Sequence, residues 1–260
     1  MNVCFSFCEH DREMATALAR HIECLGGAGE HEVFLLYPEN VNAREIMGPL
    51  KESFLAVHVV TYPPMLNGWP DGPNQCFQVA CETMLPKNEP WLWLEADCVV
   101  TTPKWLDIIQ KEYQWHGRPV LGVKNNSFAP DGKVDGQHVT GVAVYPHDLL
   151  KLCPSLKTMT KATKAYREGG TLPPAFDCYI APWAVKNCAE TTVIRHYWKS
   201  RNFREALDGT VYCDFQVPYG VSNAVDMDAV LIHGAKDFSL LDIVQKRLTT
   251  AIPTVMNTAA

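Results

Sequence analysis

The N-terminal part of the chain restricts the fold most strongly, because it alternates strand and helix patterns. Residues 2–7 are a short β-rich run, and residues 32–37 (EVFLLY) are a second apolar run that Pro38 closes. Apolar residues at helical spacing lie between the two runs: Met14, Leu18, Ile22 and Leu25. A helix that links neighbouring strands in this order makes them parallel. We therefore expect an α/β fold with a mainly parallel central sheet and helices on both faces.

The remainder of the chain continues this alternation without an internal repeat or a low-complexity linker. We expect further strands at residues 55–61, 91–100, 119–123, 139–145 and 230–233. We expect further helices at residues 74–84, 103–117, 176–184 and 237–249. Thr102 and Pro103 fit the cap and the first position of the second of these helices, and Pro182 is expected to break the third. The length then suits a single domain over residues 1–260.

Composition argues against several protein classes. No apolar run approaches the roughly 18–20 residues that cross a bilayer, and we expect no signal peptide because the N-terminus lacks a basic segment followed by an apolar one. The ten cysteines form no C-x-x-C pair, so a zinc site is not expected, and reduced thiols are the simplest interpretation. We expect a cytoplasmic protein with no membrane partner.

Two acidic residues interrupt the most apolar of the expected strands. The run WLWLEADCVV at residues 91–100 contains Glu95 and Asp97, whose side chains share one face of a strand. Neighbouring carboxylates are costly to bury unless a positive charge lies beside them, and a divalent cation is the usual solution. The alternative is that both acids lie in solvent beyond the strand end. If a cation holds them, Asp97→Asn should abolish activity and leave stability nearly unchanged, because it relieves repulsion.

A second polar group follows the last expected strand. In the sequence LIHGAKD, His233 ends the strand and Lys236 comes three residues later. A histidine can complete the ligand shell of a metal, and a lysine can neutralise a departing diphosphate. A lone histidine after an apolar strand is more often structural, so His233 gains weight only if it meets the acidic pair.

These motifs follow the order seen in the GT-A glycosyltransferases, which the chain resembles over most of residues 2–240. EAD at 95–97 occupies the position of that family's acidic D-x-D-type motif, from which its first residue departs. HGAK at 233–236 resembles the late metal-binding histidine segment of several members. Three shorter segments add to the resemblance: GPNQCFQVA (72–80), TGVAVYP (140–146) and AFDCYIAP (175–182).

The resemblance implies a metal-dependent enzyme that moves a sugar from a nucleotide-diphosphate sugar, such as a UDP-sugar, to a hydroxyl group. Asp97 and His233 would hold Mn²⁺ or Mg²⁺. Residues of about 1–100 would bind the donor, and residues of about 101–260 would bind the acceptor. The other donor-binding candidates are Phe7, Glu9, Asn74, Glu95 and Lys236. Two of these have open alternatives, since Glu95 would serve the metal, the ribose or neither, and Phe7 is equally an ordinary core residue.

The same resemblance implies a candidate base and an acceptor contact. Asp177 would take the proton of the acceptor hydroxyl if the enzyme inverts the configuration of the sugar. If configuration is retained, Asp177 would orient the acceptor and no base would be needed. As a residue without a chemical role, Asp177 would be a helix cap or a surface acid. Gly141 would line the acceptor.

Charge is distributed unevenly along the chain. Residues 151–204 contain ten Lys and Arg residues against three acids, a charge of +7, so the remainder must carry −13 to give the net charge of −6. The basic and aromatic run RHYWKSRNFR supplies four candidate acceptor-binding residues: Arg195, Lys199, Arg201 and Arg204. Such a segment suits a polyanionic partner, although a solvated helix face is the simpler alternative.

The leading acceptor hypothesis is DNA that carries hydroxymethylated pyrimidines. Bacteriophages glycosylate such bases with small transferases, and that role would place the protein in the host cytoplasm. A small molecule, a glycan or a protein are the alternative acceptors. Two other function classes stay open: a nucleotidyltransferase, which should have a glycine-rich loop after the first strand where this chain has FSFCEHDRE, and a non-catalytic α/β binding module.

Overall fold

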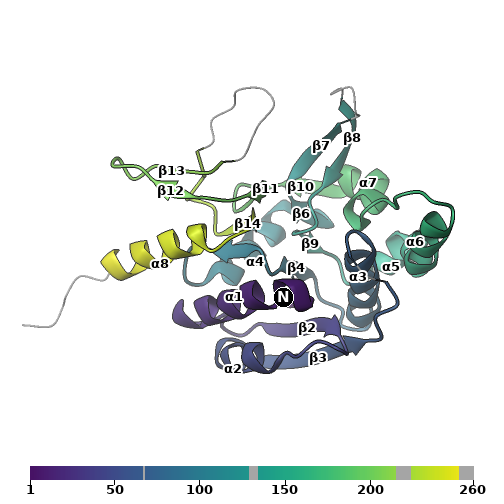
Figure 1. Ribbon diagram of the computed structural model, residues 1–260, viewed down its shortest axis with the longest axis horizontal. Helices are drawn as coiled ribbons and strands as arrows, with labels where there is room; N and C mark the ends of the chain where they lie inside the picture. Colours follow the sequence, from purple (N-terminus) through teal and green to yellow (C-terminus); the bar gives the residue numbers. More distant parts are fainter. Residues whose placement is uncertain (67, 129–133, 215–223, 252–260) are drawn as a thin grey trace, which may run out of the picture.

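The computed structural model describes residues 1–66, 68–128, 134–214 and 224–251. At its centre lies a seven-stranded sheet in the order β10-β6-β9-β4-β1-β2-β3 (Figure 1). Its strands are β1 (Asn2–Ser6), β2 (Glu32–Pro38), β3 (Ala56–Tyr62), β4 (Trp91–Glu95), β6 (Val120–Gly122), β9 (Val144–Tyr145) and β10 (Cys188–Glu190). Only β9 runs antiparallel to its neighbours in this sheet. The expectation of a mainly parallel central sheet is confirmed.

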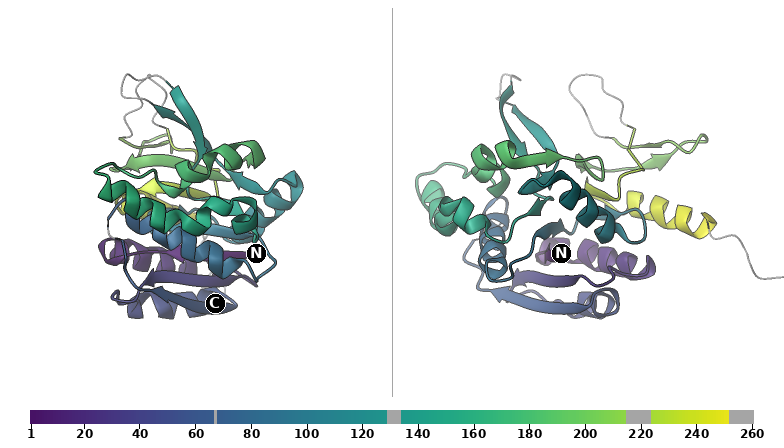
Figure 2. Two further views of the ribbon diagram at one scale, coloured as in Figure 1. Left: turned by 90° about the vertical axis from the view of Figure 1, so that its right-hand side faces the viewer. Right: turned by 180° about the vertical axis from the view of Figure 1, so that it is seen from behind.

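Helices cover both faces of this sheet, as expected. The α-helices of the described residues are α1 (Arg12–Cys24), α2 (Arg44–Ser53), α3 (Asp71–Met84), α4 (Trp105–His116), α5 (Leu149–Leu152), α6 (Met159–Glu168), α7 (Phe176–Asn187) and α8 (Ser239–Ala251), of which α8 packs against β12. Right-handed connections place α1 and α2 on one face, because both steps from β1 to β3 run in the same direction. The step from β3 back to β4 reverses direction and places α3 on the other face, where α6 packs beside it (Figure 2).

An aromatic cluster holds the interior together between α3, β4, β9 and α7. The ring of Phe77 stacks on Phe176 with centroids 4.0 Å apart, and it meets Trp93 edge-on at 5.2 Å. Trp91 and Tyr145 pack against the same ring. Because Phe176 begins α7, this cluster fixes the start of that helix next to the end of β4.

None of the helices within the described residues is long and apolar enough to cross a membrane.

A second, three-stranded sheet stands beside the central one in the order β11-β14-β5. It contains β5 (Cys98–Val100), β11 (Ile194–Ser200) and β14 (Leu231–Ala235). β14 runs parallel to β11 and antiparallel to β5. Two hairpins complete the described part of the fold: β7 (Lys124–Phe128) with β8 (Val134–Val139), and β12 (Arg204–Glu205) with β13 (Val211–Tyr212).

Several local expectations from the sequence are wrong. The run at 91–100 is two strands, because the chain turns after Glu95 and β5 leaves the central sheet to pair with β14. The expected strand at 139–145 divides in the same way between the end of β8 and the short β9. Residues 194–200 form a strand, so the alternative of a helix face for the basic run is also wrong.

Two expectations about helix ends are wrong as well. α4 does not begin with Pro103 behind a Thr102 cap; it begins at Trp105, after Lys104 takes a left-handed conformation with φ of 57°. Pro182 does not break α7, which continues to Asn187. A proline inside a helix removes one backbone hydrogen bond, and here the buried residues Phe176, Ile180 and Ala184 hold both halves of the helix against the core.

Candidate active site

The turn between β4 and β5 carries the two acids, and β14 returns to meet it. β4 ends at Glu95, and Asp97 precedes β5. The backbone N–H groups of Gly234 and Ala235 both donate to the carbonyl oxygen of Asp97, at 3.2 and 3.1 Å. Gly234 has a φ of 96°, a backbone conformation that favours glycine. The strand pairing therefore places His233 next to the turn that carries Glu95 and Asp97.

Glu95, Asp97 and His233 form one cluster. Nε2 of His233 lies 3.2 Å from Oε2 of Glu95 and 3.5 Å from Oδ1 of Asp97. One ligand atom from each residue lies within 4.8 Å of the others. The other oxygen of Glu95 accepts a 2.8 Å hydrogen bond from the indole N–H of Trp93, which orients the carboxylate toward His233.

Charges in the cluster are balanced. The ammonium group of Lys236 forms an ion pair with Oδ2 of Asp97. Burial alone would raise the pKa of Asp97, but His233 and Lys236 outweigh it and hold that pKa well below its usual range. Burial would lower the pKa of His233, but the two acids raise it to about 10. Two carboxylates thus face two cationic groups, and no net charge is buried.

The cluster fits a divalent cation. A small cation with six ligands holds them at about 2.1 Å, so neighbouring ligand atoms lie about 3 Å apart. The two distances from Nε2 of His233 to the carboxylate oxygens are close to that spacing. Carboxylate oxygen and imidazole nitrogen are also the donor types that Mn²⁺ accepts. A bound cation would take the place of the hydrogen on Nε2.

Gly141 lies against this cluster, and a side chain does not fit there. A Cβ at position 141 would lie 2.7 Å from Cζ of Phe176 and 3.0 Å from Oε1 of Glu95. The hydroxyl of Tyr145 donates to the Gly141 carbonyl at 3.0 Å and holds this backbone in place. Gly141 therefore allows the Phe176 ring to approach Glu95. Asp177 is the next residue in the chain after Phe176.

Asp177 lies in the first turn of α7 and faces His138 of β8. Nε2 of His138 is 3.8 Å from Oδ2 of Asp177, and the other carboxylate oxygen accepts from the backbone N–H of Cys178 at 2.8 Å. Burial raises the pKa of Asp177, His138 opposes the rise, and the charge of Glu95 adds to it. Asp177 therefore lies close enough to the acidic cluster for the charge of Glu95 to affect its pKa.

Sequence reasoning missed two histidines that border the site, His138 and His196. Nδ1 of His196 lies 2.9 Å from Nδ1 of His233. The sequence signal for His196 is its position within the run RHYWKSRNFR, where it lies among basic residues that suggested a polyanion contact instead.

The remaining donor-binding candidates differ in burial and in their partners. Phe7 is 4% exposed and packs on Tyr37 with ring centroids 5.2 Å apart, so it is part of the core here. Glu9 is exposed and pairs with Arg12. Asn74 is buried, and its amide donates to Thr163 and to the carbonyl of Pro174. Lys236 joins the cluster described above.

The four basic acceptor candidates differ in their surroundings. Arg195 forms a 2.9 Å ion pair with Asp226, so its guanidinium already has a partner. Arg201 and Arg204 are exposed. The side chain of Lys199 lies outside the described residues. The basic residues of α5 and α6 lie near α3, on the opposite side of the molecule from β12 and β13 (Figure 1), so the +7 segment is divided in space.

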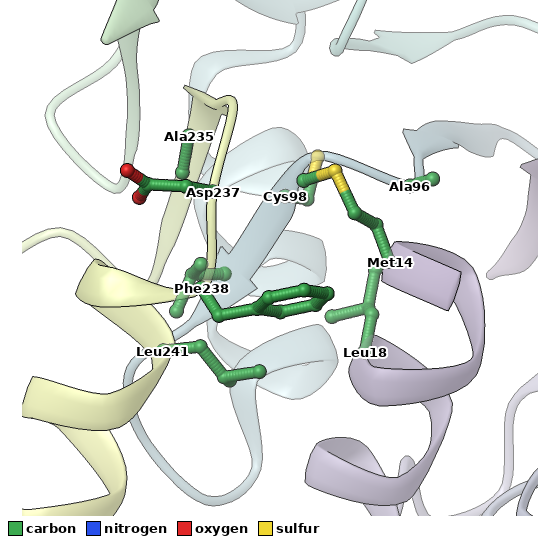
Figure 3. Close-up of a pocket in the computed structure, with 9 residues that line it drawn as sticks. Met14, Leu18, Ala96, Cys98, Ala235, Asp237, Phe238 and Leu241 are labelled. Atoms are coloured by element: carbon green, nitrogen blue, oxygen red, sulfur yellow. The ribbon is translucent and has the colours of Figure 1, made fainter. Parts of the chain in front are cut away.

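A small pocket behind the acidic turn is apolar. It lies between α1 and α8 and is lined by Met14, Leu18, Ala96, Cys98, Val99, Ala235, Asp237, Phe238 and Leu241 (Figure 3). The Asp237 carboxylate points away from the apolar side chains in this view, and it accepts from the backbone N–H of Ser239 at the start of α8. The walls lack converging polar groups, so the pocket does not suit a nucleotide.

Two solved glycosyltransferases have a similar architecture. The galactosyltransferase LgtC, solved with donor and acceptor sugar analogues, has 10% identity and a TM-score of 0.56, and the match covers 98% of this chain and 97% of that one. Mouse xyloside xylosyltransferase 1 has 11% identity and a TM-score of 0.51, over 90% of this chain and 98% of that one. The chain has a GT-A glycosyltransferase fold. No protein-family model and no curated protein sequence matches it.

The ion pairs change what we expect of Asp97→Asn. The sequence alone suggested relief of repulsion, but the substitution leaves His233 and Lys236 without their main partner. Removing one member of a buried ion pair costs about 3–5 kcal/mol, and the partial exposure of Lys236 reduces this, so we expect a loss of about 2 kcal/mol. Urea unfolding at neutral pH with a chelator present measures it.

The matched control is Asp107→Asn. Asp107 also pairs with a histidine, His31, but its side chain is half exposed, so its loss should cost less than about 1 kcal/mol. An Asp97→Asn protein as stable as the wild type would mean that carboxylate repulsion, and not the ion pairs, dominates the cluster.

Proposed function

We propose that this protein is a metal-dependent glycosyltransferase that moves a sugar from a nucleotide-diphosphate sugar, such as a UDP-sugar, to a hydroxyl acceptor. The observation that carries the proposal is the convergence of Glu95, Asp97 and His233 at the end of β4. In open α/β sheets, ligands bind beyond the carboxyl ends of the parallel strands, which is where this cluster lies. The GT-A fold supports the same class of reaction.

The residues of the cluster have distinct roles in this proposal. Asp97, His233 and Glu95 would hold Mn²⁺ or Mg²⁺, and when bound this ion neutralises charge on the departing diphosphate. Lys236 donates to the same diphosphate, because its ammonium group lies at the cluster. In this proposal residues 1–100, Asp97 among them, supply most of the donor site. His233 and Lys236 reach that site from the C-terminal half of the chain.

Asp177 is the proposed base, with the acceptor bound along Gly141. Burial keeps its carboxylate in an environment that raises its pKa, which makes it a better proton acceptor than an exposed aspartate. His138 lies on the other side of the carboxylate and favours its charged form. Residues 101–260 hold the acceptor in this proposal.

For the acceptor, we propose a polyanion, with hydroxymethylated DNA as the leading case. The basic residues at 195–204 support this proposal, since those of α5 and α6 lie on the opposite side of the molecule. Arg201 and Arg204 are the exposed residues that would contact phosphates, since Arg195 is paired with Asp226. A base in a duplex would have to be flipped out for its hydroxyl to reach the donor.

The first test of the function is release of nucleoside diphosphate from a panel of nucleotide sugars, with Mn²⁺ or with a chelator. Release should require the ion, and His233→Ala should lower it by about 10²–10³-fold, because charge on the leaving group is no longer neutralised. His58→Ala is the control, since His58 also pairs with a carboxylate, Glu32, but lies on edge strand β3.

Other outcomes of this assay separate the alternative functions. A nucleotidyltransferase would instead release pyrophosphate from a nucleoside triphosphate. A binding module would release neither product. Metal-independent release from a nucleotide sugar would contradict the role of the cluster.

The second test concerns Asp177 and pH. A base works only when deprotonated, so turnover should fall as pH falls through its pKa. Because burial raises that pKa, the fall should begin above the range of an exposed aspartate. Asp177→Asn should lower turnover by about 10²–10⁴-fold, retain donor affinity and remove this acidic limb.

Glu190→Gln is the control for Asp177→Asn, since Glu190 is an exposed acid in the same half of the chain. Turnover of Asp177→Asn close to that of the wild type would refute the base and favour a retaining mechanism, in which Asp177 only orients the acceptor.

The third test concerns the acceptor. Affinity for a duplex with hydroxymethylated pyrimidines should weaken steeply between about 50 and 200 mM salt, because each phosphate contact releases counterions. Arg201→Gln and Arg204→Gln should each reduce the slope of log K against log salt by about 0.9 and spare donor hydrolysis. Lys161→Gln on α6 is the control for the other basic region. A flat salt dependence, or transfer to uncharged acceptors alone, would refute the polyanion.

A further inference from the structure

His196 is the neighbour of His233 on the adjacent strand. β11 and β14 are parallel, and the two histidines are partners in the register of that pair. Side chains at paired positions lie on the same face of a sheet. The ring centroids are 4.5 Å apart, and the two Nδ1 atoms are 2.9 Å apart. One of these two nitrogens must carry the hydrogen that joins them.

The other side of the His233 ring decides which nitrogen carries it. Nε2 of His233 faces the oxygens of Glu95 and Asp97. A neutral imidazole has one hydrogen, and the nitrogen that binds a metal cannot carry it. If Nε2 is the metal ligand, the hydrogen is on Nδ1 of His233, and His196 accepts it through a bare Nδ1.

We propose that His196 is a positioning residue that fixes the tautomer and the ring orientation of His233, so that Nε2 faces the carboxylates as a metal ligand. The proposal rests on the metal site of the proposed function. The reverse assignment, with the hydrogen on His196, would leave the single hydrogen of a neutral His233 on Nε2 and block that ligand position. Partners of this kind commonly determine which ring nitrogen of a histidine binds a metal.

The strand that carries His196 is itself held on its other face. Side chains alternate along a strand, so Arg195 and Tyr197 point away from His196. Nε of Arg195 donates to the carboxylate of Asp226 at 2.9 Å, and the hydroxyl of Tyr197 accepts from the backbone N–H of Asp226 at 2.6 Å. These contacts anchor β11 and give Arg195 a structural role beneath the site.

Two variants separate the hydrogen bond from the bulk of the ring. His196→Leu removes the acceptor and fills the same position with an apolar side chain. His196→Asn keeps an acceptor, because its amide oxygen is attached at the same position along the side chain as Nδ1. Titration calorimetry with Mn²⁺ should show a loss of affinity of about 10- to 100-fold for His196→Leu and affinity close to wild type for His196→Asn. His58→Leu is the control, since that histidine is remote from the cluster, and it should bind Mn²⁺ as the wild type does.

Nitrogen-15 spectra of the histidine rings provide a readout that does not need a working enzyme. Nδ1 of His233 should carry a hydrogen in the metal-free protein and should keep it when Mg²⁺ is added, whereas Mg²⁺ should displace the hydrogen on Nε2. In His196→Leu this bonded hydrogen should exchange faster with water. A hydrogen found on Nδ1 of His196, or unchanged Mn²⁺ affinity in His196→Leu, would overturn the proposal.

Failure of the metal site would be distinguishable from failure of this inference. A wild-type protein that binds no Mn²⁺ would refute the proposed metal dependence. The metal-free spectra would still show which histidine donates, and a donating His196 would refute the positioning role. If His196→Leu does not fold, the comparison of His196→Asn with the wild type keeps both measurements available: an affinity loss in His196→Asn as large as about 10-fold would count against the acceptor role.

Discussion

The charge balance at the turn between β4 and β5 is the constraint on which the site depends. Two carboxylates at the end of a buried strand are stable only if cationic groups or a metal lie beside them. His233 and Lys236 meet that requirement, but they come from the far end of the chain. They reach the turn because β14 pairs with β5 in the antiparallel direction, and the carbonyl of Asp97 accepts from two backbone N–H groups of β14. The acidic turn and the last strand stabilise each other, and neither half of the chain contains the site alone.

The aromatic core extends this constraint to the other side of the site. Trp93 packs its ring against Phe77 and donates its N–H to Glu95, so one residue serves both the core and the cluster. Phe77 in turn stacks on Phe176, which precedes Asp177. The distance between the acidic turn and Asp177 is thus set by rigid rings and by the absence of a side chain at Gly141. A reaction between a donor and an acceptor needs this kind of fixed spacing.

Sequence patterns predicted the parallel sheet and the helices on both faces, which follow from apolar periodicity, a local property of the sequence. The cost of burying charge indicated a cation beside the acidic strand end, and the resemblance to GT-A glycosyltransferases implied that the late histidine would join it. The division of residues 91–100 into two strands was not predictable in that way. Cys98 to Val100 are as apolar as the strand before them, and only their pairing with β14 shows that they belong to a second sheet. His196 was missed for the same reason, because its importance depends on the register between β11 and β14.

Lys236 shows why an ion pair at this position is compatible with binding a diphosphate. An ammonium group has three hydrogens to donate, and its ion pair with Asp97 uses one. The side chain is 37% exposed, so the remaining donors have access to a ligand. Burial of Lys236 would lower its pKa, but the charge of the Asp97 carboxylate, whose side chain is 7% exposed, outweighs this and raises the pKa, so the lysine stays charged. The same ion pair limits its rotamers before any ligand arrives. The entropy of ordering a flexible lysine is then already lost in the folded protein, and a bound diphosphate would gain most of the charge–charge attraction without that cost.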